Sequence, residues 1–330
     1  MAGLVTGLAN ATVNASTVLI LAGLGELISE RAGVLNLGVE GIMLVGALSG
    51  FVTAFVTGSY WLGFGVAILA GGLISLVHAF LCISLNSDQA VSGIMLTLLG
   101  TGLTTYFGNS WSGKSISGFP ERTLPLVGEY LVEIPILGTA LFQSTVTDYA
   151  ALLLVPVVWL FLYRTNIGLE LVSVGEDPET ADTMGVDVFK MRYLAVVLGG
   201  MFAGAAGAHL SLAFNEIWSA SMTSGRGWIA VALVIFARWR PERILLGAYL
   251  FGLFNALQLY SQGLDITLGT GVPLAGLLNP VLNFVLNPTI MSTYPYIVTL
   301  LVLVLTVFRA ENRELAQPSA LVQSYSRELD

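Results

Sequence analysis

Long runs of apolar residues with almost no charge recur along this chain, and they restrict it to folds that live in a lipid bilayer. Most of these runs approach or exceed the roughly 20 residues that a helix needs to cross the hydrocarbon layer. Charged residues make up only 10% of the 330 residues, against about a quarter in an average soluble domain. Because lipid offers no hydrogen bonds, the backbone N–H and C=O groups of each spanning segment must form hydrogen bonds within the protein. The predicted fold class is therefore all-α, a polytopic membrane protein.

Nine runs predict about nine transmembrane helices, with a range of eight to ten. Two of them, 149–163 and 227–239, are short for a full crossing. The nine runs span 12–29, 34–57, 61–85, 90–108, 149–163, 193–214, 227–239, 244–262 and 290–308. Residues 1–330 are expected to form one transmembrane domain.

Basic residues near the ends of the runs predict the orientation, because they accumulate on the cytoplasmic side. With the N-terminus outside, ten fall on the cytoplasmic side and three outside. The ten are Arg31, Arg164, Lys190, Arg192, Arg238, Arg240, Arg243, Arg309, Arg313 and Arg327, and the three are Lys114, Arg122 and Arg226. We therefore expect a cytoplasmic loop at 164–192, an external loop at 109–148 and a cytoplasmic tail at 310–330.

The remaining composition excludes several classes of function. The net charge of −8 gives no reason to expect nucleic acid as a partner. The single cysteine, Cys82, permits no intrachain disulfide, and no cluster of cysteine and histidine suggests a metal or another cofactor. His78 and His209 are expected to be hydrogen-bonded packing residues, because neither has an acidic residue at helical spacing. No nucleophile–base pairing indicates an enzyme.

The string GNSWSGKS, Gly108 to Ser115, matches the phosphate-loop pattern. That pattern binds nucleotide only when a strand precedes it and a helix follows it. Here a predicted membrane span precedes it, and Ser117–Pro120 is a poor helix start. We interpret the match as coincidental.

The loop between Arg164 and Arg192, RTNIGLELVSVGEDPETADTMGVDVFKMR, is the most informative polar segment. Pro178 suits the first turn of a short helix, with Asp177 as its N-cap. Glu179 and Asp182 favour the positive end of that helix dipole, and Gly185 can end it. The segment is either a partner-binding element or an ordinary solvated helix between spans.

Several polar residues inside the spans are candidates for a translocation pathway, because polar groups at depth are costly and often functional. Asn36 and Glu40 share a helix face, and Glu40 equally suits a brace for a neighbouring helix near the cytoplasmic interface. The others are Gln89, Ser92, Arg226, Trp228, Asn255 and Gln258. Asp88 is expected to be an N-cap beside Gln89 and Ser92, and Arg226 and Trp228 are expected at the external mouth. The small residues of 199–208 favour tight helix packing.

Four strings together resemble the permease subunits of ATP-binding cassette importers, in the nucleoside and simple-sugar branch of the ribose and branched-chain amino acid permease family. They are ERAGVLNLGVEGIMLVGA, SDQAVSGIML, GEDPETADTMGVDVFKMRYLAVVLGGMFAGAAGAHLSL and TSGRGWIAVALVIFARWRP. The resemblance runs from about residue 20 to residue 310 in unchanged order.

The resemblance implies a non-enzymatic subunit that imports nucleosides or related simple sugars and binds no cofactor of its own. Its implied partners are cytoplasmic ATPases, a second related permease and an external solute-binding lipoprotein, all at the cell membrane. It also implies a coupling helix that contacts the ATPase, at Gly175, Glu176, Asp177, Pro178, Ala181, Met184 and Gly185. The alternative is an ion-coupled secondary transporter with Glu40 as the coupling acid.

Overall fold

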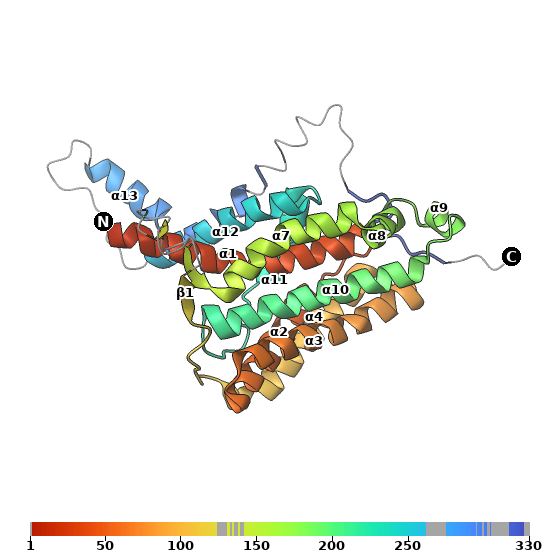
Figure 1. Cartoon of the computed structure of the whole chain (residues 1–330). Coiled ribbons are helices and arrows are strands. Elements are labelled where there is room, and N and C mark those ends of the chain that lie inside the picture. Colours follow the sequence, from red (N-terminus) through yellow and green to blue (C-terminus); the bar gives the residue numbers. More distant parts are fainter. Residues whose placement is uncertain are drawn as a thin grey trace. The chain divides into compact units, whose positions relative to one another are not determined.

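The structure is a computed structural model of the chain, and it is predominantly helical (Figure 1). The residues it describes are 2–123, 131–132, 134, 138, 142–261, 275–294, 296–298, 300–301, 304 and 317–326. Among them, seven helices are long and apolar enough to cross a membrane. The all-α membrane fold is thereby confirmed.

The described helices follow one another in this order along the chain. They are α1 (Ala2–Arg31), α2 (Val39–Thr57), α3 (Tyr60–Ala79), α4 (Gln89–Gly108), α7 (Val146–Arg164), α8 (Asn166–Glu176), α9 (Pro178–Thr183), α10 (Val188–His209), α11 (Arg226–Ala237), α12 (Pro241–Ser261), α13 (Ala275–Val285) and α14 (Pro288–Met291). Wider helical turns, η1 (Phe80–Ser84) and η3 (Leu210–Phe214), extend α3 and α10, and η2 (Asn109–Trp111) follows α4. Two short strands, β1 (Glu121–Thr123) and β2 (Gln143–Thr145), pair with each other.

Two of the nine predicted spans differ in the structure. The run at 34–57 contains a helix only from Val39, because residues 34–38 are not helical. The run at 227–239 is α11, whose 12 residues are fewer than a full crossing needs. Eight of the 19 residues of the predicted span at 290–308 lie outside the described residues.

The chain divides into two compact units. The smaller unit is Met1–Ser16, Arg122–Ser144 and Ala248–Glu314, and the larger is Thr17–Glu121, Thr145–Gly247 and Leu315–Asp330. In the smaller unit, rings of α12 pack edge-on against tyrosines that follow α14, with Phe251 and Tyr296 at 6.4 Å and Phe254 and Tyr294 at 6.0 Å between centroids. The candidate coupling residues all belong to the larger unit.

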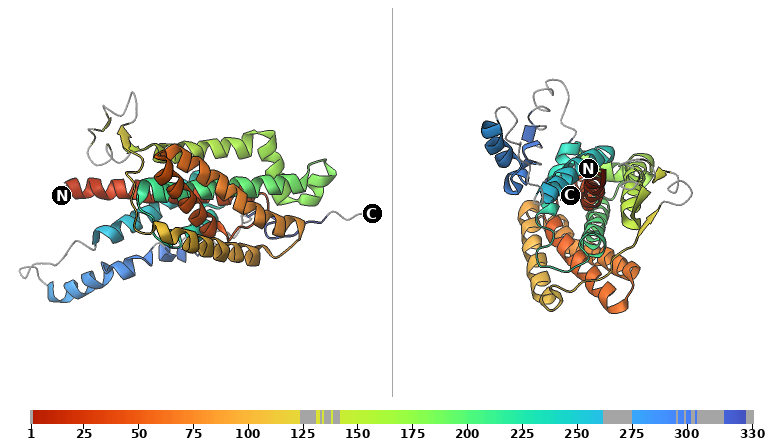
Figure 2. Two further views of the ribbon diagram at one scale, coloured as in Figure 1. Left: turned by 90° about the horizontal axis from the view of Figure 1, so that it is seen from below. Right: turned by 90° about the vertical axis from the view of Figure 1, so that its left-hand side faces the viewer.

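In the larger unit, α10 packs closely along α2 and α3 (Figure 2). Glycines permit this approach: a β-carbon added to Gly46 of α2 would lie 2.6 Å from the Cα of Gly204 in α10. Only a residue without a side chain fits there, because backbones in van der Waals contact leave no room for one. The tight packing predicted for 199–208 is confirmed.

The non-helical stretch at 32–38 is held by polar side chains from three helices. Gln89 of α4 accepts a hydrogen bond from the Leu35 amide at 2.8 Å, and His78 of α3 lies 3.1 Å from the Leu35 carbonyl oxygen. Glu26 of α1 accepts the Asn36 amide at 2.9 Å. Irregular backbone is tolerated in a membrane protein where protein groups satisfy it. These side chains therefore explain why α2 begins late.

Candidate functional site

The α8–α9 corner is built by local capping. Asp177 ends α8 and accepts hydrogen bonds from the amide (3.0 Å) and the hydroxyl (2.6 Å) of Thr180, so it is the N-cap of α9. These hydrogen bonds lower the pKa of Asp177. Pro178 occupies the first turn of α9, and Gly185, with φ of +90°, follows its end. The three roles predicted from sequence are confirmed.

The corner has a buried side and an exposed side. Ala181 is buried in a cluster with Val174 of α8 and with Val188 and Met191 of α10. Glu176, Asp177, Glu179, Thr183, Met184 and Gly185 are exposed, and the Met184 side chain is 79% exposed. The α9 helix thus presents an acidic surface with one prominent apolar side chain. Figure 1 places α9 at one extremity of the larger unit.

Gly175 fixes the position of α8 against the end of α1. A β-carbon at Gly175 would overlap the carbonyl oxygen of Arg31. The next residue, Glu176, places its carboxylate 3.6 Å from Arg31 Nη1. The end of α8 therefore rests directly on the end of α1, through backbone contact and an ion pair.

Arg31 also ties α1 to the turn between α11 and α12. Its Nε and Nη2 donate to the carbonyl oxygen of Trp239 at 3.1 and 2.8 Å. The Trp239 indole donates in turn to Glu30 at 2.5 Å, and it is buried. Arg238 and Trp239 both have φ of +53°, a left-handed conformation that non-glycine residues adopt only where their surroundings hold it. The Arg31 and Glu30 contacts provide that support.

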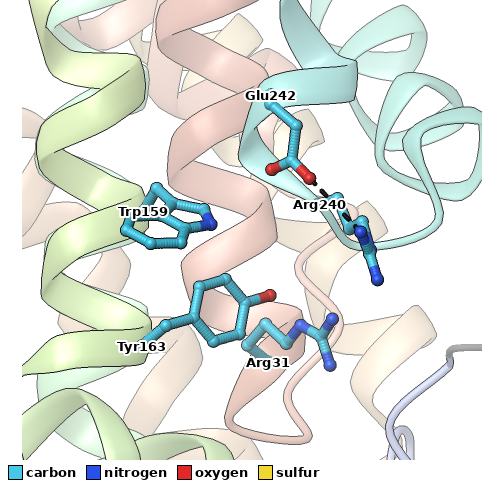
Figure 3. A pocket seen from close by; sticks show the side chains of 5 residues that line it. All are labelled: Arg31, Trp159, Tyr163, Arg240 and Glu242. Carbon is cyan, nitrogen blue, oxygen red and sulfur yellow. Dashed lines mark ion pairs between the residues drawn. The ribbon is translucent and has the colours of Figure 1, made fainter.

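A pocket of about 300 Å³ opens beside Arg31 (Figure 3). Its lining side chains are Arg31, Trp159, Tyr163, Arg240 and Glu242. Arg240 and Glu242 form an ion pair at 3.6 Å, and the Arg31 guanidinium lies 6.0 Å from the Tyr163 ring centre. Arg164 lies over the Trp159 ring at 5.7 Å. Three of the ten basic residues grouped by the orientation argument therefore gather at one end of the larger unit.

Glu40 braces α11. Its Oε1 accepts hydrogen bonds from the Thr223 hydroxyl (2.6 Å) and the Gly225 amide (2.8 Å), and its Oε2 accepts the Gly227 amide at 2.6 Å. A carboxylate at a helix N-terminus satisfies free amides and complements the helix dipole. The sequence left two interpretations of Glu40 open, a pathway residue and a brace for a neighbouring helix. The contacts of Glu40 match the brace.

Three further pathway candidates hold the 32–38 stretch and its surroundings. The Asn36 side chain accepts the Gly38 amide at 3.0 Å, and the Gln89 side chain bonds Leu35. Ser92 lies 3.0 Å from His78 Nδ1. All are buried, and their contacts are structural. Their place in a translocation pathway stays a prediction.

The other pathway candidates belong to two different units. Arg226 donates to the carbonyl oxygens of Met222 and Thr223, and Trp228 is 40% exposed. Because the neighbouring Gly227 bonds Glu40, Arg226 lies level with the first turn of α2. The expected place of Arg226 at the external mouth stays a prediction. Asn255 and Gln258 are on α12, in the smaller unit.

A buried polar network around Asp148, at the start of α7, was not predicted from the sequence. Asp148 accepts hydrogen bonds from Thr17 of α1 (2.6 Å) and from the hydroxyl (2.7 Å) and amide (2.9 Å) of Thr145. His209 of α10 lies 3.7 Å from Asp148 and 2.8 Å from the Thr147 hydroxyl. The Thr-x-x-Asp spacing of a capping box was the available signal. The expected hydrogen bonding of His209 is confirmed, and its acidic partner comes from another helix.

The phosphate-loop match has no phosphate-loop structure. The Lys114 ammonium lies 4.4 Å from the Trp111 ring centre and 5.2 Å from that of Phe55. Residues 112–120 contain no helix. The interpretation of the match as coincidental is confirmed. In the described part of the chain, no group of three or more His, Cys, Asp or Glu side chains could hold a metal ion.

Comparison with known proteins assigns the family. Residues 8–307 match the family described as branched-chain amino acid transport system, permease component. A putative glucose ABC transporter permease of Haloferax volcanii, TsgC13, is 68% identical over 98% of both chains. The guanosine ABC transporter permease NupQ of Bacillus subtilis is 34% identical, over 91% of this chain and 92% of NupQ. The nucleoside ABC transporter permease NupC of Lactococcus lactis is 36% identical, over 73% of this chain and 78% of NupC.

No solved structure matches the chain significantly. The family match covers most of the chain, and seven of the described helices have the length and apolarity of membrane spans. The chain is therefore a multi-pass cell-membrane protein and belongs to the permease components of the branched-chain amino acid transport system family.

Proposed function

We propose that this chain is the permease subunit of an ATP-binding cassette importer for a simple sugar or a nucleoside. A separate cytoplasmic ATPase hydrolyses ATP, and the α8–α9 corner receives the resulting force. The permease itself provides the conduit and performs no hydrolysis. Family membership supports the general role, and the geometry of the α8–α9 corner supports the mode of coupling.

The observation that carries the coupling proposal is the seating of α9. This six-residue helix exposes Met184 and acidic side chains on one side, while Ala181 anchors the other side in an apolar cluster. Gly175 and Glu176 connect it to α1 through Arg31. A partner that pushes on α9 would therefore displace the end of a membrane-spanning helix. The proposed contact residues are Glu176, Asp177, Met184 and Gly185, with Gly175, Pro178 and Ala181 as their support.

The same proposal fixes the orientation and the division of the chain. The end that holds α9, Arg31, Arg164 and Arg240 faces the cytoplasm, and the N-terminus lies outside. The 164–192 segment is then the coupling loop, 310–330 is a cytoplasmic tail, and 109–148 is an external loop. The complete importer also contains a second related permease and an external solute-binding lipoprotein, in a shell of membrane lipid.

The names of the relatives bear on the solute. The relative with 68% identity is named for glucose, and those with 34% and 36% identity are named for guanosine and nucleosides. Both solutes contain a polyhydroxylated ring. Uptake of radiolabelled glucose and guanosine by cells with and without this gene distinguishes them. If deletion of the gene reduces the uptake of neither glucose nor guanosine, both solute classes are refuted.

A cross-linking experiment tests the coupling contact. Cys82 is replaced with alanine, and a photoactivatable thiol reagent is attached either at Met184→Cys or at Ser112→Cys. Ser112 is also exposed but lies beyond the far end of α4, so it is the matched control. The ATPase should be captured from Met184→Cys alone. Capture from neither position, in a complex that still transports, would refute the α9 contact.

The ion-coupled alternative has no support among the comparisons. Both carboxylate oxygens of Glu40 are engaged by α11, which accounts for its burial without a coupling role. Reconstitution of the purified chain in liposomes separates the two mechanisms. Solute uptake driven by an ion gradient, without an ATPase, would favour the alternative.

A further inference from the structure

We propose that the ten residues of the C-terminal segment Gln317–Ser326, termed the clamp, hold the coupling helix α9 on the ends of α1, α8 and α10. This inference rests on the proposed coupling role of α9 and adds a second, distant part of the chain to it. Figure 2 shows the C-terminal segment at the same extremity as α9.

The clamp joins the ends of α8 and α1 through backbone hydrogen bonds. The Ala320 amide donates to the Gly175 carbonyl oxygen at 2.9 Å, and the Val322 amide donates to the Gly33 carbonyl oxygen at 3.2 Å. Gly33 has φ of +86°, and a β-carbon there would lie 3.1 Å from the Ala320 carbonyl oxygen. Ala320 is only 2% exposed. At Ala320 the clamp is therefore inserted between the two helix ends.

The ion pair between α1 and α8 is shared with the clamp. One Glu176 carboxylate oxygen faces Arg31 at 3.6 Å, and the other lies 3.3 Å from both the amide and the hydroxyl of Ser319. Glu176 thus contacts two other chain segments at once. Its carboxylate is oriented by both, although it remains partly exposed to solvent.

Tyr325 extends the clamp to α9 itself. Its hydroxyl donates to Asp182 of α9 at 3.0 Å, and its ring lies 5.8 Å from that of Phe189 in α10. The same side chain packs on the apolar cluster that contains Ala181. One tyrosine therefore connects the coupling helix with the helix that follows it.

The clamp also covers a buried cation. Arg192 of α10 is 2% exposed, and its Nη1 donates to the Gln323 carbonyl oxygen at 3.1 Å. Its Nε and Nη2 are buried without a hydrogen-bond partner among the described residues. Removal of the clamp would take away that acceptor and open Arg192 to water. Burial of a charged group with incomplete hydrogen bonding is costly, so the other contacts of the clamp must offset this desolvation.

These contacts address a mechanical weakness of α9. A helix of six residues has little stability of its own, because so few hydrogen bonds follow its costly nucleation. Asp177 and Gly185 at its two ends are natural bending points. Without a further attachment, a push on α9 would bend these points instead of moving α1. The clamp supplies attachments to α8, α1 and α10, so a displacement of α9 is transmitted.

The experiment measures the number of ATP molecules hydrolysed per solute imported by the complete importer in liposomes. Tyr325→Ala and a truncation before Gln317 should raise this ratio about threefold or more, while the ATPase still binds. Tyr325→Phe, which loses the hydroxyl but keeps the ring, should have a smaller effect. Ser324→Ala is the control, because Ser324 is exposed and its side chain makes no hydrogen bond within the described part of the chain.

Amide hydrogen exchange provides a second readout that does not depend on transport. Tyr325→Ala should speed exchange in Pro178–Gly185 while α3 remains protected. An unchanged ATP-to-solute ratio together with unchanged exchange in both variants would overturn the clamp. If the truncated chain does not insert, Tyr325→Ala alone decides the outcome. If the clamp is refuted but the Met184→Cys cross-link to the ATPase is still formed, the coupling role of α9 stands. If the full-length chain forms no such cross-link, the coupling role of α9 is refuted.

Discussion

Gly175 lies against the carbonyl oxygen of Arg31 so closely that a single methyl group would overlap it. This contact and the Glu176–Arg31 ion pair place the coupling corner directly on a membrane-spanning helix. Substitutions in this contact should therefore affect transport differently from substitutions a few residues away.

Gly175→Ala should displace α8 from α1 and strongly reduce transport. Overpacking of this kind typically costs about 1–3 kcal/mol of stability. Gly185→Ala is the matched comparison: a β-carbon at Gly185 meets nothing within 4 Å, so only the strain of φ at +90° remains. Solute uptake and thermal unfolding in detergent measure both variants. Equal uptake by the Gly175 variant and the parent chain would contradict the close contact.

Glu176→Lys should uncouple ATP hydrolysis from uptake and barely change stability. The new ammonium would face Arg31, and the two hydrogen bonds from Ser319 would be lost. Because Glu176 is 45% exposed, water screens its pair with the buried Arg31, so the pair should contribute about 0–1 kcal/mol and insertion should persist. Normal ATP-driven uptake in this variant would argue against the assignment of Glu176 to coupling.

Glu40→Ala should destabilise the larger unit, because it leaves three donors at the start of α11 without their acceptor. Each unsatisfied buried group costs about 1–3 kcal/mol. Glu40→Gln keeps one acceptor oxygen and should be milder. Uptake by the Gln variant should remain dependent on ATP and insensitive to a proton ionophore. Loss of an existing ion dependence would instead identify Glu40 as a coupling acid.

Asp148→Ala should be more damaging than His209→Asn. Asp148 accepts hydrogen bonds from Thr17 and Thr145 as well as facing His209, so its loss leaves donors on α1 and at the N-cap of α7 without their acceptor. Thermal unfolding of the purified permease in detergent measures the difference. A smaller shift for Asp148→Ala than for His209→Asn would show that the histidine, rather than the aspartate, organises this network.

The cap of α9 should weaken in acid. Hydrogen bonds from Thr180 lower the pKa of Asp177 in the folded chain, so Asp177 binds fewer protons when folded than when unfolded. The stabilisation is therefore fully present above the ordinary aspartate pKa of about 3.9, and it is lost as the pH falls through the lowered value. Protection of the Thr180 amide, measured by hydrogen exchange, should follow this course. In Asp177→Asn the acid-dependent loss should disappear.

Local chemistry made part of this structure predictable. The apolar runs identified most of the helices, and the Asp–Pro and Gly residues of the coupling corner defined the two ends of α9. Asp88 was correctly expected to be an N-cap, and it accepts the Val91 amide at 2.8 Å. Each of these features depends on residues within one or two turns of each other, which a sequence displays directly.

The remaining features depend on contacts between distant residues. The late start of α2 follows from Gln89 and His78, which bond the backbone of Leu35 across the fold. A hydropathy pattern includes 34–38 in a span because it depends on apolar side chains alone. It contains no information on which side chains form hydrogen bonds with the backbone. The Asp148–His209 pair escaped notice because a search at helical spacing cannot find partners on different helices. The Tyr325–Asp182 contact joins residues 143 positions apart, so no local pattern announces it.

The absence of side chains where α2 meets α10 has a mechanical consequence. With Gly46 and Gly204 in close backbone contact, no side chain separates the two helices there. We therefore expect these two helices to move together as one block during a transport cycle. Spin labels on α2 and α10 would therefore keep a constant separation while the pathway alternates, and the hinges of the cycle must lie at the block's margins.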